Sequence, residues 1–258
     1  MKKKGIFAYF GHHKCAMVWV RKILSKVCKQ LTLKFAHVDS PLQFNNNLAE
    51  FVKSNRVDFL VYINANINFT FQLKNIRGFH VIRDPRDIAV SSYFSHLFSH
   101  PTNIWEALKE HREKLRVLPK SEGLLLDIEF IHKGVFECLQ DWDYSLPHIL
   151  ELKMEDLIHG PIQKFSEILN FLGLLEMDSS KSSSKRISLK KLSKILKKNS
   201  FLKLSGGRNP GVENVHNHFR KGEPGDWKNH FTNKHKIFFK KRYGDLLIKL
   251  GYEKDNNW

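Results

Sequence analysis

Residues 6–31 read IFAYFGHHKCAMVWVRKILSKVCKQL, and this stretch decides the expected fold class. The apolar run Ile6 to Phe10 has the length and composition of a buried strand. After a turn at Gly11 to Cys15, apolar side chains recur at helical spacing, at positions 19, 20, 23, 24, 27 and 31. A buried strand that enters a helix through a turn with glycine and lysine is the beginning of a phosphate-binding βα unit.

Further apolar runs of strand length follow along the chain, with helical segments between them. The expected strands cover residues 59–63, 78–82 and 148–154, with a shorter candidate around Phe35, and expected helices cover 104–118 and 162–172. Alternating strands and helices are typical of parallel sheets. We therefore predict an α/β fold: a single domain over residues 1–258, with a P-loop-like parallel β-sheet flanked by helices on both faces. Ligands of such sheets bind at the carboxyl ends of the strands, and each expected strand ends in polar residues.

The charge of the chain predicts an anionic partner. Lysine and arginine number 43 against 26 acidic residues, so the formal net charge is +17. A nucleotide, an acidic acceptor, a nucleic acid or a membrane surface would each satisfy this charge. Hydrophobic residues make up 41% of the chain, which is enough for a sizeable core.

The cysteines and the apolar runs indicate the cellular compartment in which the protein is expected. Cys15, Cys28 and Cys138 give an odd count without a close pair, which disfavours a disulfide framework and favours a reducing, cytoplasmic setting. No apolar run is long enough to cross a bilayer, so no transmembrane segment is expected.

The composition changes after residue 178. Residues 179–186 are rich in serine and lysine and are interpreted as a mobile linker. Residues 181–203 carry many basic side chains and no acid, with an apolar stripe at positions 189, 192, 195 and 196. The favoured interpretation is a surface helix that docks through this stripe with its lysines in water. A membrane or nucleic-acid contact is the alternative.

The segment from Gly11 to Trp19 is the first candidate anion site. A helix N-terminus offers backbone amides and the positive end of the helix dipole, and Lys14 adds a full charge. The GxxxxGK[ST] spacing is absent, and Cys15 stands where an NTPase would place its magnesium-binding hydroxyl, so a metal-dependent NTPase is disfavoured. Adjacent histidines point in different directions, so His12 and His13 with Cys15 do not predict a metal site, and no metal is expected.

Two other segments combine helix or turn signals with cations. In Arg83 to Ser91, Asp84 is the expected N-cap, Pro85 suits the first helical position and Asp87 complements the dipole. Arg83 at a strand end and Ser91 two turns into the helix could hold one phosphate between them. Residues 219–228 read FRKGEPGDWK; two glycines around a proline predict a turn whose amides face an anion, beside two cations.

Together these three segments resemble cytosolic-type PAPS-dependent sulfotransferases. Residues 83–91 are similar to the family's 3′-phosphate motif, and residues 220–228 to its C-terminal RKGxxGDWK signature. Lys14 and Trp19 match the lysine and tryptophan of its PKSGTTW loop. The order and spacing also match, over nearly the whole chain.

The resemblance implies a cofactor and a role for each matching residue. The cofactor would be 3′-phosphoadenosine 5′-phosphosulfate (PAPS), with adenosine 3′,5′-bisphosphate (PAP) as its product, and no metal would take part. Lys14 would contact the phosphosulfate and stabilise the leaving phosphate. The other implied cofactor contacts are the loop residues Cys15, Ala16, Met17 and Val18, the 3′-phosphate ligands Arg83, Ser91, Arg220, Lys221 and Gly222, and Trp19 and Phe201 around the adenine with Ser200 nearby.

The sequence departs from the family at the reacting end of the site. Met17 and Val18 replace two threonines, and Ala16 replaces a glycine. The family's catalytic histidine aligns with Asn64 or Asn66, neither of which removes a proton. His96 is our candidate general base, with His37 and Asp39 as alternatives. The family's dimerisation pattern begins at Lys228 and Thr232 and then fails, so the oligomeric state is not predicted.

The expected function is sulfuryl transfer from PAPS to a hydroxyl or amine of an unidentified, hydrophobic small-molecule acceptor, with no specific nucleic-acid partner. One alternative is a non-catalytic protein that binds PAP or PAPS. Another is a basic module that binds membranes or nucleic acids. A small-molecule kinase would need magnesium ligands that the sequence does not offer.

Overall fold

A five-stranded parallel sheet organises the residues that the computed structural model describes, 5–103, 105–176 and 185–258. The strands are β1 (Ile6–Gly11), β2 (Phe35–Val38), β3 (Phe59–Ile63), β4 (Ile76–Ile82) and β5 (Ile149–Lys153). Their order across the sheet is β2-β3-β1-β4-β5, and every neighbouring pair is parallel. The first strand of the chain therefore lies at the centre, where backbone bonds on both sides hold it in register.

The chain divides into two compact units. The sheet unit comprises Met1–Ile82 and Asp141–Ser200, and the helical unit comprises Arg83–Gln140 and Phe201–Trp258. All five strands belong to the sheet unit.

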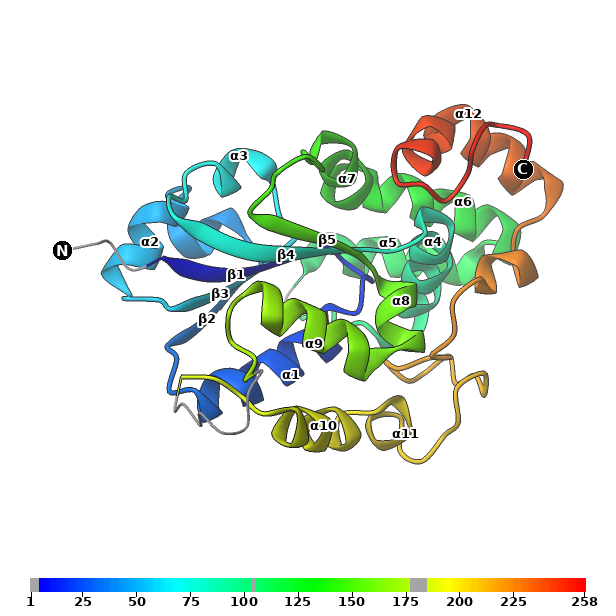
Figure 1. The fold of residues 1–258 in the computed structure, drawn as a ribbon. Helices are drawn as coiled ribbons and strands as arrows, with labels where there is room; N and C mark the ends of the chain where they lie inside the picture. The colour runs from blue at the N-terminus through cyan, green and yellow to red at the C-terminus, as the bar shows by residue number, and fades with distance from the viewer. Residues whose placement is uncertain (1–4, 104, 177–184) are drawn as a thin grey trace. The chain divides into compact units, whose positions relative to one another are not determined.

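Helices cover both faces of the sheet within the sheet unit (Figure 1). On one face, side chains such as Tyr9 and Phe79 form a core with α1 (Met17–Gln30), α9 (Pro161–Phe171) and α10 (Leu189–Lys198). On the other face, Phe10 and Tyr62 pack with α2 (Leu48–Ser54) and α3 (Ile67–Thr70) and with Trp142. The sheet unit also contains η1 (Pro41–Phe44) and α8 (Met154–His159). The predicted α/β class, with a parallel sheet between two helical layers, is confirmed.

The helical unit is built around α4 (Pro85–Phe94), which packs on α6 (Lys120–Ile131). Its other elements are η2 (Ser95–Ser99), α5 (Glu106–Val117), η3 (His132–Phe136), α7 (Glu137–Asp141, which ends at the unit boundary), α11 (Phe201–Leu204), η4 (Asp226–Asn229) and α12 (Asn233–Lys249). Aromatic rings of Phe136, Phe239 and Tyr243 lie 4.7–5.9 Å apart in its core. As predicted, the Asp84 side chain caps α4 by accepting a hydrogen bond from the Arg86 amide, and Pro85 is the first helical residue.

The main difference from the expected elements is at the end of β5. Strand character was expected to continue through Met154, but this residue begins α8. Residue 104 and residues 177–184, which hold most of the predicted linker 179–186, lie outside the described residues. Cys15, Cys28 and Cys138 form no disulfide, and burial raises the pKa of the Cys28 thiol to about 12.

Helix α10 follows the amphipathic interpretation of the basic segment. The Ser188 side chain caps it, Leu192, Ile195 and Leu196 are buried, and its lysines are exposed. Leu189 is the exception to the predicted stripe, because 51% of its surface is exposed. Among the described helices, none combines the length and the apolar character needed to span a bilayer.

The burial of side chains along α10 predicts that two leucines contribute very differently to the stability of the protein. We expect Leu192→Ala to lower the free energy of unfolding by about 2–5 kcal/mol, because it removes a fully buried side chain and leaves a cavity. The exposed Leu189→Ala should change it by no more than about 0.5 kcal/mol. Urea unfolding measures both. Equal losses would contradict the docking of α10 through Leu192.

Candidate functional site

The turn between β1 and α1 presents backbone amides where the sequence predicts an anion. Ala16 is the N-cap of α1, provides no side-chain cap and has a φ of 57°. The first helical bond runs from the Val20 amide to the Ala16 carbonyl, so the amides of Met17, Val18 and Trp19 have no intrahelical acceptor. Lys14 also has a positive φ, of 65°. Two departures into the left-handed region within three residues, each costing roughly 1–2 kcal/mol for a residue with a Cβ, are the kind of local strain found at ligand sites.

The sheet unit brings Trp19 next to the segment that contains Ser200. The Trp19 indole nitrogen donates to the Asn199 carbonyl at 2.8 Å, although the two residues are 180 positions apart. The Trp19 ring also meets the Phe165 ring edge-on at 5.6 Å. The side chain of Trp19, which is assigned to the adenine, is thus fixed both by its indole N–H and by its ring contact.

In the helical unit, Asp87 joins the second and third motifs. One oxygen of its buried carboxylate accepts from the Gly225 amide at 2.6 Å, and the other accepts from the Trp227 amide at 2.9 Å. The Arg83 guanidinium lies 4.0 Å from the same carboxylate. Sequence reasoning assigned Asp87 only to the helix dipole. Its larger structural role is to bind the 219–228 turn to the beginning of α4.

Arg86 also connects distant segments of the helical unit, and this was not predicted from the sequence. Its buried guanidinium pairs with Asp84 at 2.8 Å and with Glu253 at 2.5 Å. It also lies over the rings of Trp227, at 4.0 Å, and Trp258, at 4.5 Å. Burial alone would lower the pKa of Arg86, but the two carboxylates raise it, so the charge is held in place.

The cations of the 219–228 turn converge on one carboxylate. Asp226 accepts from Arg220 and from Lys221, each at 2.5 Å, and also from Asn229 and His230. Burial would raise the pKa of Asp226, but the hydrogen bonds from His230, Lys221, Asn229 and Arg220 outweigh it and lower this pKa. Arg220 also pairs with Glu213. The turn therefore contains an internal anion that organises its cations.

Gly222 places this turn against Phe201. Its φ is 75°, and a Cβ at this position would lie 2.5 Å from the Phe201 ring. A glycine is required on both counts. Two residues assigned to one cofactor, Phe201 and Gly222, are thereby neighbours within the helical unit. Ser91 lies partly buried on α4, and its phosphate contact stays a prediction.

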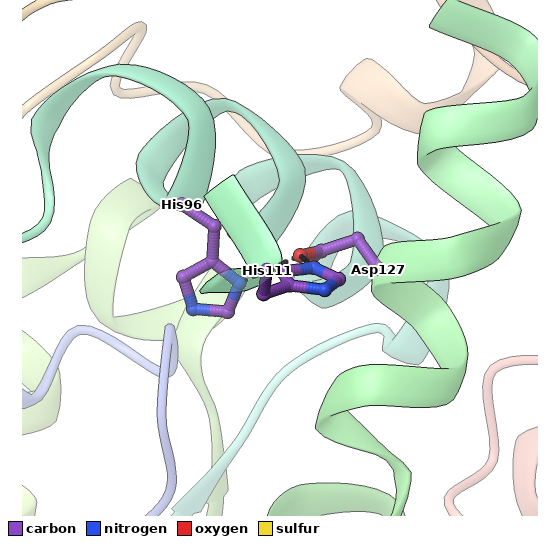
Figure 2. A group of neighbouring side chains, drawn as sticks. All are labelled: His96, His111 and Asp127. Atoms are coloured by element: carbon purple, nitrogen blue, oxygen red, sulfur yellow. Dashed lines mark hydrogen bonds and ion pairs between the residues drawn. The ribbon is translucent and has the colours of Figure 1, made fainter. Parts of the chain in front are cut away.

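His96, the candidate base, belongs to a buried cluster (Figure 2). Its Nδ1 lies 2.6 Å from Asp127 Oδ1 and 3.2 Å from Ser92 Oγ, and His111 Nε2 lies 2.8 Å from the same Asp127 oxygen. Burial would raise the pKa of Asp127, but the nearby His96 and the hydrogen bonds from both histidines lower it. The role of His96 in proton transfer stays a prediction.

Two groups of described residues have the ligand types and spacing for a cation. His96, His111 and Asp127 form one group, and Glu213, Asp226 and His230 form the other, with ligand atoms within 4.8 Å of one another in each. Hydrogen bonds and ion pairs within each group, or to neighbouring cations, account for both arrangements.

Both asparagines at the end of β3 have structural roles. The Asn66 side chain accepts from the Asn68 amide and caps α3. Asn64 has a φ of 54° and donates through its side chain to the Asp39 carbonyl at 3.4 Å. The alternative base His37 lies 3.1 Å from the Arg21 guanidinium, and burial, assisted by Arg21, lowers its pKa.

Comparisons with known proteins converge on one family. A family model described as the sulfotransferase domain matches residues 19–251. Sulfotransferase 1E1 of Bos taurus is 26% identical over 176 residues, or 63% of this chain, and the match spans about half (52%) of that relative.

Solved structures share the fold at low identity. Mouse sulfotransferase SULT7A1, solved with PAP, aligns with a TM-score of 0.64 over 96% of this chain and 87% of its own, at 16% identity. Retinol dehydratase, solved with androsterone and PAP, aligns with a TM-score of 0.55 over 93% of this chain and 80% of its own, at 15% identity. The same enzyme with retinol and PAP gives a TM-score of 0.53 at 14% identity, over 93% of this chain and 81% of its own.

The ion pairs of Asp226 predict a pH-dependent contribution to stability. We expect Asp226→Asn to cost about 1.5–3 kcal/mol at pH 7, because an amide cannot replace the charge-assisted bonds. The folded pKa lies below the unfolded value of about 3.9, so this stabilisation is complete above that pH and is lost as the pH falls through the folded pKa. The difference from wild type, measured by urea unfolding, should therefore shrink below about pH 4.

The exposed Asp245→Asn on α12 is the matched control for this measurement, and it should change stability little at any pH. A cost of Asp226→Asn that is the same from pH 3 to pH 8 would contradict the electrostatic origin.

Proposed function

Because the chain belongs to the sulfotransferase domain family, we propose that it binds PAPS and transfers the sulfuryl group to a hydroxyl or amine of a small molecule. The observation that carries the proposal is Asp87. Its carboxylate joins the 83–91 motif to the 219–228 motif through two backbone amides. Contacts between residues 138 and 140 positions apart thus hold the two motifs as one cationic constellation.

The 3′-phosphate is assigned to the helical unit. Arg83 offers a two-pronged guanidinium, and Arg220 and Lys221 add charge. These two cations are already gathered by Asp226, so a phosphate would meet side chains whose conformations are restricted beforehand. Ser91 and the Gly222 amide complete the proposed ligands. Trp19 and Phe201, with Ser200, are assigned to the adenosine.

The phosphosulfate is assigned to the β1–α1 turn. The residues present fit this group, because the N-terminus of α1 lacks a side-chain cap and follows two left-handed residues, Lys14 and Ala16. Bound PAPS would supply an activated sulfuryl group. Lys14 and the amides of residues 16–19 would orient it and stabilise the negative charge that grows on the phosphate oxygen.

A non-catalytic protein that binds PAP is the second candidate. It is favoured by the use of Asn66 as the cap of α3 and by Met17 and Val18, which remove two hydroxyl donors from the loop. Such a protein would keep nucleotide affinity and lack turnover. The two proposals therefore share one binding prediction and differ only in sulfuryl release.

The acceptor is proposed to be hydrophobic. The retinol dehydratase complexes hold androsterone and retinol, which are small and largely apolar molecules. Phe71 and Phe98 of this chain are substantially exposed apolar side chains that could contact such an acceptor. A cytoplasmic location stays a prediction.

The 3′-phosphate assignment predicts discrimination between two nucleotides. PAP should bind wild-type protein more tightly than adenosine 5′-monophosphate, which lacks only the 3′-phosphate. Arg83→Met should reduce this preference about 10- to 150-fold, because one charge-assisted hydrogen bond contributes about 1.5–3 kcal/mol. Calorimetric titration and the rise in melting temperature with each nucleotide measure the effect.

Arg242→Met, the same substitution at an exposed arginine that pairs with Glu129, is the matched control and should leave the preference intact. ATP with magnesium is the control ligand for an NTPase site. Equal affinity of wild-type protein for PAP and adenosine 5′-monophosphate would overturn the proposed function.

A further inference from the structure

A chain of three hydrogen-bonded side chains lies at the carboxyl end of the sheet beside the β1–α1 turn. His12 Nε2 lies 2.8 Å from His80 Nε2, and His80 Nδ1 lies 2.7 Å from Glu151 Oε2. The other oxygen of Glu151 accepts from the Trp142 indole at 2.8 Å. His12 and His80 are fully buried.

Sheet register explains why these residues meet. His80 on β4 is the register partner of Glu151 on β5 and of Phe10 on β1. Register partners in parallel strands share a face, and so do residues two apart along a strand. His12, two residues after Phe10, therefore continues on the face that carries His80. The Trp142 ring, 4.1 Å from the His80 ring, covers the chain.

The hydrogen positions along this chain follow from Glu151. A carboxylate only accepts, so His80 must carry its hydrogen on Nδ1. In neutral His80 the Nε2 atom is then an acceptor, and it takes the hydrogen on His12 Nε2. The lone pair of His12 is thereby placed on Nδ1.

His12 Nδ1 is thus the acceptor end of an oriented pair of imidazoles. It is buried and has no hydrogen-bond partner among the described residues. Burial, assisted by the neighbouring His80, lowers the pKa of His12, so the imidazole is neutral at pH 7 and Nδ1 carries no proton. His12 is also only two residues from Lys14 in the loop assigned to the phosphosulfate.

We propose that His12 is the general base of sulfuryl transfer and that His80 and Glu151 are positioning residues that hold its Nδ1 lone pair available. This inference rests on the proposed function. It places the base directly after β1 instead of at the end of β3, where Asn66 caps a helix.

His12 Nδ1 takes the proton of the acceptor hydroxyl while the hydroxyl oxygen bonds to sulfur. The bond from sulfur to the 5′-phosphate oxygen breaks, and its electron pair leaves with PAP. The hydrogen bonds from His12 to His80 and from His80 to the Glu151 carboxylate keep the His12 ring oriented during the transfer.

The tautomers can be measured without any ligand. Long-range ¹H–¹⁵N correlation spectra of the full-length protein should show His80 protonated on Nδ1 and His12 protonated on Nε2. In Glu151→Gln, the Trp142 indole keeps the carbonyl oxygen of the new amide, whose NH₂ then faces His80 Nδ1. Both histidines should switch, and His12 should carry its hydrogen on Nδ1. A wild-type His12 protonated on Nδ1 overturns the proposal.

Kinetic measurements then distinguish a role of His12 as general base from a purely structural role. Sulfate release from ³⁵S-labelled PAPS, and transfer to 2-naphthol as acceptor, should fall about 10²- to 10⁴-fold in His12→Gln. The same rates should fall in Glu151→Gln, and PAP affinity should change less than about threefold in both variants. His148→Asn and Glu167→Gln, at exposed positions in the sheet unit, are the controls and should keep wild-type rates.

The outcomes distinguish this inference from the proposed function. Wild-type protein that fails to bind PAP overturns both. Wild-type protein that binds PAP without turnover overturns the base and leaves nucleotide binding standing. Turnover that survives in folded His12→Gln, with its PAP affinity intact, overturns the base alone.

Discussion

The position of β1 between β3 and β4 is the constraint from which the other features follow. Five residues of β1, from Phe7 to Gly11, pair on both sides in parallel register, so Gly11 lies level with Ile63 and Val81. The polar residues that follow these strands must then leave the sheet at the same edge. The left-handed turn at Lys14 to Ala16 and the uncapped start of α1 lie there because the strand before them cannot slip without moving its core side chains to the wrong face.

Much of this arrangement could be predicted from the sequence, because apolar runs and turn residues act locally. The strand at 59–63, the Asp84 cap with Pro85, and the docking of α10 through positions 192, 195 and 196 all depend on residues near each other in the chain. Met154 was misjudged because it is apolar and continues the run of β5, while helix α8 begins there.

The contacts that could not be predicted are those between distant segments. Asp87 was assigned to a helix dipole, since nothing near it in the chain indicates that Gly225 and Trp227 will donate to it. The partners of His96, which are Asp127 and His111, come from two other helices. His12 was weighed only as a metal ligand with its sequence neighbours, because its contact with His80 spans 68 residues. One of these contacts could have been predicted. Asp226, the aspartate of the RKGxxGDWK signature, lies among several cations in the sequence, and such an acid is expected to form ion pairs.

The packing of Gly222 against Phe201 has a consequence for how such chains diverge. Any side chain at 222 would overlap the aromatic ring, and the positive φ disfavours most residues with a Cβ even without the ring. A substitution of Gly222 therefore requires an earlier replacement of Phe201 by a smaller residue. Even then asparagine is the main accessible replacement, because it tolerates a positive φ. The two positions should covary in related sequences, and an ancestor that lost the aromatic ring would be freer to lose the glycine afterwards.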